Sequence, residues 1–151
     1  MIRRVAPFVP ADISEVQLVP QQQRDFDTDG MAAAAQTLAN AGSAFTLRTR
    51  DGRMLAACGI VAIDAGYGHG WAFMDSRAGP HMRWLTQTVR THIDAKMASH
   101  RRIEIMVRAD WVAARRWAAK LGFANEGLLE CAARDGGDMI RFARINRGNV
   151  T

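Results

Sequence analysis

The sequence is poor in several residue types, and each shortage narrows the kind of protein that it can encode. Its 151 residues include one tyrosine, two cysteines, two lysines and four prolines. No apolar run approaches the roughly 20 residues that a membrane-spanning helix requires, so we expect no membrane partner. The N-terminal stretch MIRRVAPFVPADISEV lacks an apolar core of signal-peptide length, which predicts a cytoplasmic protein.

Neither the cysteines nor the histidines form a recognisable covalent or metal motif. Cys58 and Cys131 both fall in strand-like stretches. A disulfide between them is one alternative, and two reduced, half-buried thiols in a cytoplasmic protein are the expected one. His69 and His81 have no partner at metal-ligand spacing, so we expect no metal.

The positive charge is carried almost wholly by arginine. The formal net charge is +5, and 18 of the 20 basic residues are arginines. The guanidinium fork suits phosphate oxygens, although the codon usage of a GC-rich genome produces the same bias. The arginines are scattered along the chain rather than clustered, so no nucleic-acid partner is expected.

Length and a hydrophobic content of 48% predict one globular domain over residues 1–151. Alternation and turn signals predict the elements. A glycine-rich loop is expected at 65–70. Gly30 is expected to divide the second helical stretch, and Gly42 to end it. In chain order we expect a strand at 2–8, helices at 10–19 and 21–42, strands at 43–50, 54–63 and 71–76, a helix at 79–98, a strand at 101–107, a helix ending at 121, and strands at 124–133 and 138–145.

Three glycines and one apolar stripe carry most of this prediction. Asp51-Gly52 is a hairpin signal, and Gly59 inside the third strand predicts a bulge. An apolar stripe recurs at helical spacing from Met82 to Met97. Gly122 is expected just past a helix end with positive φ.

The strand–helix–strand–helix order in the middle of the chain requires a crossover. This makes 71–76 and 101–107 neighbouring parallel strands in an otherwise antiparallel sheet. The fold class is therefore mixed α+β.

The stretch ARRWAAKLGFANEG resembles the penultimate helix, Leu-Gly-Phe stop and following Glu-Gly of the GNAT (GCN5-related N-acetyltransferase) superfamily. The residues ADI near the N-terminus and the closing hairpin at Asp135-Gly136-Gly137 also fit, so the resemblance covers nearly the whole chain. A narrower resemblance is to compact acetyltransferase-like proteins of tailed phages and prophages, relatives of the internal virion protein of T7-like phages. In that group the cofactor turn is often eroded.

The resemblance implies that the two parallel strands splay apart and that acetyl-coenzyme A or another acyl-coenzyme A lies between them. The pyrophosphate of this cofactor would bind at the start of the following helix. The turn departs from the family pattern, because Ser76 replaces Arg or Gln, Pro80 removes an N–H donor, and His81 replaces a small residue. The residues that the resemblance assigns to the cofactor are Ala72, Phe73, Met74, Arg77, Gly79, His81, Met82, Arg83 and Arg115.

The resemblance also implies a catalytic acid and base, and neither is obvious in this sequence. The position of the family's tyrosine acid holds Ala118, the position of a frequent asparagine holds Trp111, and the only tyrosine is Tyr67. Asp75, Glu104 and Asp110 are candidate bases, and each also has the pattern of a solvated carboxylate at a strand end. His69 and His81 are similarly ambiguous.

Two functions stay open. The first is acetyl transfer from an acyl-coenzyme A to a small-molecule or protein amine. The second is an acetyltransferase-like scaffold without chemistry, serving phage morphogenesis or binding a partner. A homodimer and a virion partner are open alternatives as well, and a phage-encoded protein would be virion-associated rather than simply cytoplasmic.

Overall fold

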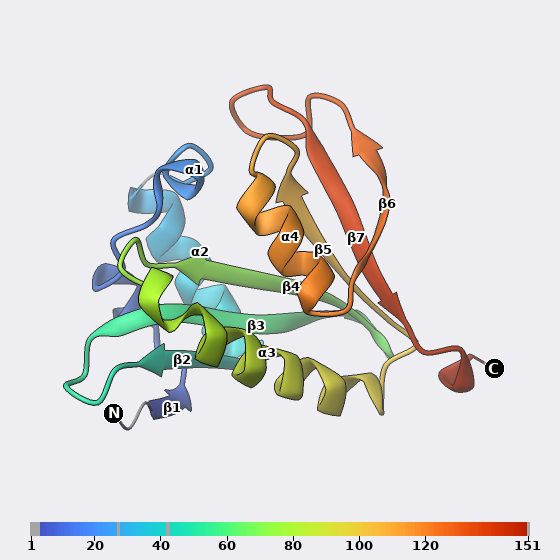
Figure 1. The fold of residues 1–151 in the computed structure, drawn as a ribbon, viewed down its shortest axis with the longest axis horizontal. Helices are drawn as coiled ribbons and strands as arrows, with labels where there is room; N and C mark the ends of the chain where they lie inside the picture. The colour runs from blue at the N-terminus through green and yellow to red at the C-terminus, as the bar shows by residue number, and fades with distance from the viewer. Residues whose placement is uncertain (1–3, 27, 42, 151) are drawn as a thin grey trace. The chain divides into compact units, whose positions relative to one another are not determined.

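A computed structural model describes residues 4–26, 28–41 and 43–150. Its strands form one sheet in the order β1-β2-β3-β4-β5-β7-β6 (Figure 1). Strands β4 and β5 are parallel, and the β1–β2, β2–β3, β5–β7 and β6–β7 pairs are antiparallel. The predicted mixed α+β fold and its parallel pair are confirmed. The strands are β1 Arg4–Pro7, β2 Ala44–Arg48, β3 Met54–Asp64, β4 Tyr67–Met74, β5 Arg102–Arg108, β6 Ala124–Leu129 and β7 Met139–Ile145.

The chain divides into two compact units. The N-terminal unit comprises Met1–Val61 with Trp71–Arg83, and the C-terminal unit comprises Ala62–Gly70 with Trp84–Thr151. The single domain predicted over 1–151 stays a prediction. The helices are α1 Pro20–Gln23, α2 Thr28–Asn40, α3 Met82–Met97 and α4 Val112–Lys120, and the short 3-10 helices are η1 Pro10–Ser14, η2 Gly79–His81 and η3 Arg147–Asn149.

The core of the N-terminal unit lies between the sheet and α2. Phe8, Ala35, Met54 and Ala57 pack together, each 5% exposed or less. The continuous apolar run that predicted a central strand is buried from Met54 to Ile60. The predicted hairpin is also confirmed, because β2 and β3 pair across a turn in which Gly52 has φ +92.

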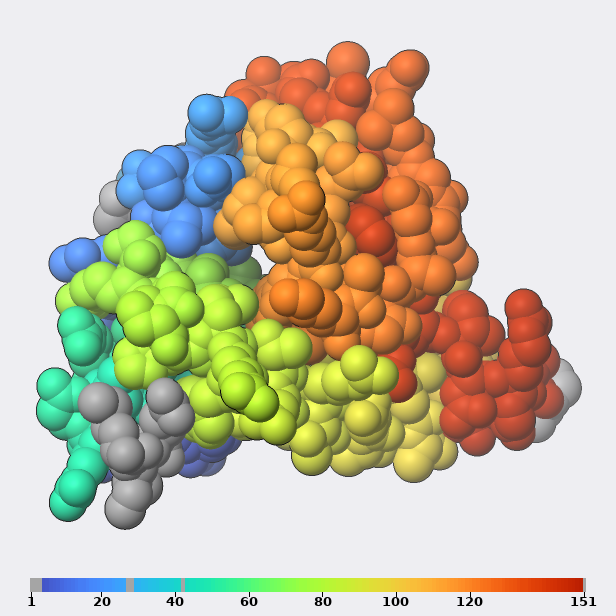
Figure 2. Space-filling model, in the orientation of Figure 1, coloured from blue at the N-terminus to red at the C-terminus, as the bar shows by residue number. Residues whose placement is uncertain are grey.

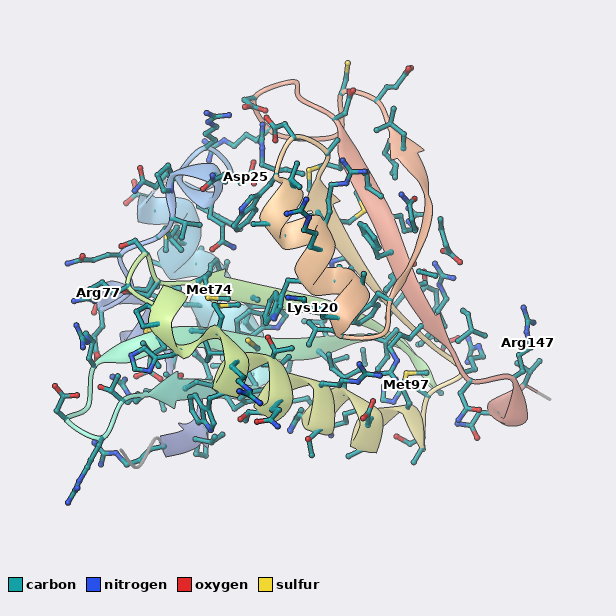
Figure 3. All side chains as sticks on the ribbon, viewed as in Figure 1. Asp25, Met74, Arg77, Met97, Lys120 and Arg147 are labelled. Atoms are coloured by element: carbon teal, nitrogen blue, oxygen red, sulfur yellow. The ribbon has the colours of Figure 1, made fainter. Side chains whose placement is uncertain are left out.

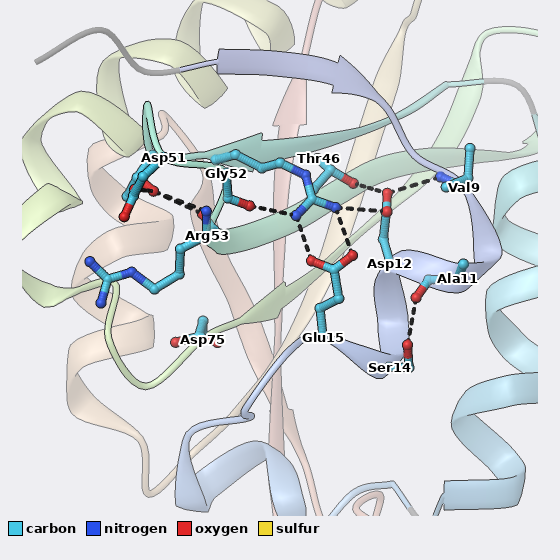
Figure 4. Close-up of polar contacts among 12 residues, drawn as sticks. Val9, Ala11, Asp12, Ser14, Glu15, Thr46, Asp51, Gly52, Arg53 and Asp75 are labelled. Carbon is cyan, nitrogen blue, oxygen red and sulfur yellow. Dashed lines mark hydrogen bonds and ion pairs between the residues drawn. The ribbon is translucent and has the colours of Figure 1, made fainter.

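A polar clamp fixes η1 against β2. Arg48 donates to Asp12 at 2.8 Å and to Glu15 at 2.6 Å, and it also reaches the carbonyl of Gly52 (Figure 4). Asp12 in turn accepts hydrogen bonds from the Thr46 hydroxyl and the amide of Val9. Asp12 therefore joins the start of η1 to β2.

Three local predictions in this unit are wrong or lie outside the described residues. Gly30 lies inside α2, and the helical stretch is divided before Thr28 instead. The register shift of the β2–β3 pair falls between Leu47 and Arg48, not at Gly59. At Gly59 a Cβ atom would come within 2.7 Å of the Trp71 ring, so close approach explains this glycine. Gly42 lies outside the described residues.

In the C-terminal unit, α3 and α4 cover one face of the sheet. The predicted stripe of α3 is confirmed, since Leu85, Val89, Ile93 and Met97 are buried. Arg144 of β7 donates to Asp94 of α3 and to the carbonyl of Leu121 at the end of α4. The C-terminal end of α3 lies beside η3, which Figure 2 draws in dark red next to the yellow end of the helix. There Asn149 donates to the carbonyl groups of residues 97, 98 and 100.

The predicted loop at 65–70 is wrong, because β4 begins at Tyr67. Tyr67, Gly68 and His69 pair with Arg102, Ile103 and Glu104 in the parallel ladder. Ladder hydrogen bonds with β5 outweigh the low strand propensity of the glycines. The implied divergence of β4 from β5 stays a prediction.

The cysteines are partly as expected. Both thiols are free, as predicted. Cys58 is buried in β3, whereas Cys131 is exposed in the loop after β6 with φ +56. The strand predicted at 124–133 ends at Leu129, since the Asp135-Gly136-Gly137 turn draws residues 130–138 into a longer loop. In the described ranges, no helix is both long and apolar enough to cross a membrane.

Candidate functional site

The edge of β4 that the resemblance assigns to the cofactor is paired with the chain itself. Alternate residues of a strand direct their backbone groups to opposite edges. The amide of Asp75 donates to the carbonyl of Leu55 in β3, so the backbone groups of Ala72 and Met74 point to the other edge of β4. There the Gln22 carboxamide donates to the carbonyl of Ala72 and accepts from the amide of Met74, both at 2.7 Å. Met74 is labelled in Figure 3.

The neighbouring residues continue this pairing. Val19 donates to the carbonyl of Met74, and Ser76 donates to the carbonyl of Gln17. These bonds form an antiparallel bridge between Leu18 and Asp75. Between Ala72 and Ser76, residues 17–22 thus take the place of a neighbouring strand.

Asp75 is not the solvated carboxylate that its position predicted. It is 1% exposed. One oxygen accepts from the amide and Nε of Arg77, and the other accepts from Arg77 Nη2 and the amide of Gln17, all within 2.9 Å. Burial would raise the pKa of Asp75, but the hydrogen bonds from Arg77 and Gln17 outweigh burial and hold it below its ordinary value. The carboxylate therefore builds the turn and is poorly suited to act as a base.

The turn from Asp75 to Met82 satisfies most of its own amides. An anion cradle needs backbone N–H groups that point outward without a partner. Pro80 has none, and Gly79 is the remaining described donor, at an open position where an added Cβ would touch nothing within 4 Å. The other amides of the turn all donate hydrogen bonds. Those of Asp75 and Ser76 donate to the carbonyl groups of Leu55 and Gln17, and those of Arg77 and Ala78 donate to the side chain and the carbonyl of Asp75. The amides of His81 and Met82 donate to the carbonyl groups of Ala78 and Gly79.

The arginines expected at a pyrophosphate are only partly available. Arg77, labelled in Figure 3, donates to Asp75 from Nε and Nη2. In the C-terminal unit, Arg115 donates to the carbonyl of Ala109 at 3.2 Å. Arg83 is exposed at the start of α3. In this conformation the Gln22 carboxamide occupies the backbone groups of Ala72 and Met74, so an acyl-coenzyme A would have to displace it to pair with this edge.

The C-terminal unit brings a second set of candidates together. Because Tyr67 pairs with Arg102 and His69 with Glu104, these four side chains share the sheet face opposite α3 and α4. His69 Nδ1 lies 3.9 Å from Glu104 Oε1. Glu104 accepts from Arg102 at 2.7 Å, and Arg102 binds Glu126 at 2.6 Å.

Burial and hydrogen bonding hold the pKa values of His69 and Glu104 below their ordinary values. Burial lowers the pKa of His69; Glu104 opposes this and Arg141 adds to it. Burial would raise the pKa of Glu104, but hydrogen bonds from Arg102 and Tyr67 keep it below its ordinary value. Near neutral pH the pair is a neutral imidazole beside a carboxylate. It is the best candidate for proton transfer in the described residues.

Asp110 and Ala118 occupy positions that serve the fold rather than the chemistry. Asp110 lies 3.3 Å from the buried Arg108, which also binds Asp135 at 2.9 Å and so ties the loop after β6 to the end of β5. Trp111 precedes α4 and makes no side-chain cap. Ala118 is 1% exposed and offers no proton. Among the described residues, no group of three or more His, Cys, Asp or Glu side chains is placed to bind a metal.

Sequence reasoning missed Gln17, Gln22, Arg102 and Arg141. The i, i+2 spacing of Arg102 and Glu104 on one strand was a usable signal for their contact. No local signal marks Gln22, since its partners lie about fifty residues away.

No protein-family model matches the chain, and no curated protein matches it. Several solved acetyltransferase structures share its fold. Ard1 from Thermoplasma volcanium is 17% identical, with a TM-score of 0.75 over 95% of this chain and 97% of that one. Ribosomal-protein-S5-alanine acetyltransferase from Vibrio fischeri is 16% identical, with a TM-score of 0.70 over 99% and 96%. The Salmonella typhimurium acetyltransferase that modifies the N-terminal serine of ribosomal protein L7/L12 is 19% identical, with a TM-score of 0.68 over 95% of each chain. The fold is that of GNAT acetyltransferases.

Proposed function

We propose that the chain is an N-acyltransferase that takes an acyl group from an acyl-coenzyme A and transfers it to a primary amine. The observation that carries this proposal is the contact between His69 and Glu104 on the parallel strands of a GNAT-type fold. The shared fold alone would not suffice, since one fold serves many functions.

The His69–Glu104 pair suits the proton transfer that this reaction needs. An amine is largely protonated near pH 7 and must lose a proton before it attacks a carbonyl carbon. Neutral His69 accepts that proton, and the Glu104 carboxylate stabilises the imidazolium that forms. When bound, the acyl-coenzyme A supplies the activated thioester. Asp75 and Asp110, the other two candidate bases, take no part in this proposal.

We expect the reaction to be slow. Ala118 cannot donate a proton, and general acid help is typically worth about 10²–10⁴-fold in rate. Binding is also expected to be weak, because Pro80 lacks an amide and most amides of the turn are already paired. Arg77 and Arg83 would contribute charge, so binding should weaken further as salt is added.

The acceptor is proposed from the relatives with this fold. The Vibrio fischeri and Salmonella typhimurium enzymes named above act on ribosomal proteins, and the latter modifies an N-terminal serine. A peptide with a free N-terminal amine is therefore the first acceptor to test, and a small-molecule amine is the second.

One observation favours a second candidate function. The edge of β4 is paired with residues 17–22, as expected of an acetyltransferase-like scaffold that no longer binds a cofactor. Such a scaffold would bind a partner protein, as in the phage-encoded proteins that the sequence resembles. A cytoplasmic location belongs to the first candidate and a virion-associated one to the second.

Calorimetry with acetyl-coenzyme A and a turnover assay against an amine panel separate the two candidates. The enzyme proposal expects measurable binding and slow turnover that His69→Gln abolishes while binding is kept. Thr91→Ala, on the exposed side of α3, is the control for handling. Absence of both binding and turnover in the intact protein would leave the scaffold as the better proposal.

A further inference from the structure

Residues 17–23 lie along the edge of β4 and offer it the same kinds of hydrogen-bonding groups as an extended ligand would. A carboxamide presents one carbonyl acceptor and N–H donors, as a peptide group or the amide of an extended ligand does. The Gln22 carboxamide uses both functions at once, toward the carbonyl of Ala72 and the amide of Met74. A ligand chain that paired with this edge would need the same two groups.

Within the segment, the amides of Gln22 and Gln23 donate to the carbonyl of Val19, and the Gln23 side chain donates to that of Leu18. Helix α1 has four residues, none of them buried, and its N-cap makes no side-chain hydrogen bond. So short a helix has little stability of its own. Leu18, 7% exposed, and the amide of Gln17 on Asp75 fix the start of the segment. Gln22 therefore lies on a weakly held turn next to a firmly held strand.

We propose that residues 17–23 are an internal competitor for the β4 edge, and that a ligand with an extended amide-bearing arm binds there by displacing the Gln22 carboxamide. That acyl-coenzyme A is such a ligand rests on the proposed function. The competition itself rests on the two hydrogen bonds of Gln22. The apparent affinity for the ligand is then the intrinsic affinity multiplied by the fraction of molecules in which Gln22 has left the edge.

Gln22→Ala removes the competing carboxamide, and Gln21→Ala is the matched control in the same helical turn. Calorimetry with coenzyme A measures the affinity of the β4 edge for the arm together with the nucleotide. Calorimetry with pantetheine measures its affinity for the arm alone. Pantetheine has no pyrophosphate, so it tests the edge apart from the turn at Pro80. We expect Gln22→Ala to bind both probes roughly tenfold more tightly or better, as loss of two hydrogen bonds would allow. Gln21→Ala should bind like the unaltered protein.

Amide hydrogen exchange at Met74 gives a second readout that needs no ligand. In the intact protein the Met74 amide is protected by Gln22, and Gln22→Ala should speed its exchange while Gln21→Ala leaves it unchanged. Unfolding curves of both variants show whether the fold is retained. The inference is overturned if Gln22→Ala binds both probes no more tightly than the unaltered protein, whatever the exchange rate at Met74.

The two proposals fail in different ways. If all three proteins bind coenzyme A equally tightly, the competitor is wrong and the acyltransferase proposal stands. If none of them binds coenzyme A or pantetheine, the acyltransferase proposal fails and no such arm displaces Gln22. Faster amide exchange at Met74 in Gln22→Ala would then show only that Gln22 protects this amide in the intact protein.

Discussion

The carboxylate of Asp75 and the guanidinium of Arg77 form a two-pronged ion pair, with Nε 2.8 Å from Oδ1 and Nη2 2.9 Å from Oδ2. Arg77 is two residues further along the chain, so the pair folds the turn back on itself after β4. The same carboxylate also accepts from the amide of Gln17.

Asp75→Asn should lower the free energy of unfolding by about 2 kcal/mol near pH 7, since it removes charge-assisted hydrogen bonds. The folded pKa of Asp75 lies below its unfolded value of about 3.9. Its contribution is therefore complete above the unfolded pKa and is lost as the pH falls through the folded pKa. Urea unfolding at several pH values checks this, with the exposed Glu130→Gln as control. A destabilisation that did not shrink in acid would contradict the assignment.

The imidazole of His69 should respond in opposite directions to changes in its two charged neighbours. Glu104 raises the pKa of His69 and Arg141 lowers it. Glu104→Gln should therefore lower that pKa and Arg141→Met should raise it, as measured by NMR titration of the imidazole. Arg102 and Tyr67 also influence His69, because both donate hydrogen bonds to Glu104. Arg102 is therefore left unchanged in both variants.

If His69 is the base, the pH–rate profile should follow the same shifts. The rate should rise with pH through the pKa of His69, below its ordinary value of about 6.5. In Arg141→Met the rise should move to higher pH. If the pH dependence of turnover is the same in the unaltered protein and in the variants, His69 is not the base of this reaction.

Gly122→Ala should destabilise the fold by roughly 1 kcal/mol or more, because φ is +92 and a side chain is strained there. A Cβ atom would also come within 3.1 Å of the Arg144 side chain. Gly136→Ala is the matched control, with φ +86 and nothing within 4 Å. Denaturation midpoints should show a loss in both variants and a larger one at Gly122. Equal midpoints for Gly122→Ala and the unaltered protein would disprove the left-handed cap.

Arg48→Met should cost about 2 kcal/mol, since it leaves the buried Asp12 without its charged partner. The exposed Arg50→Met, two residues along, controls for loss of one positive charge. Thermal unfolding compares them, and η1 should show faster amide exchange in Arg48→Met only. If both variants melt together, the clamp in Figure 4 contributes nothing measurable.

Sequence predicted well those features that local chemistry decides. The stripe of α3, the Asp51-Gly52 turn and the positive φ of Gly122 each depend on residues within one turn of each other. The burial of Asp75 and the start of β4 at Tyr67 depend on partners that are distant in the chain. A carboxylate at a strand end has the same local pattern whether it faces water or an arginine. The Gln22 contacts are of the same kind, because a glutamine in a one-turn helix carries no mark of the strand it will meet.

The two thiols differ so much in their surroundings that they report on different events. Burial raises the pKa of Cys58 to about 12, and its side chain is enclosed in β3, whereas Cys131 is exposed in the loop that Arg108 and Asp135 hold. Only the thiolate reacts with an alkylating dye. The folded chain should therefore take one label, at Cys131, without any engineered cysteine. A second label marks a molecule that has opened β3, so the ratio of doubly to singly labelled protein records how often this happens.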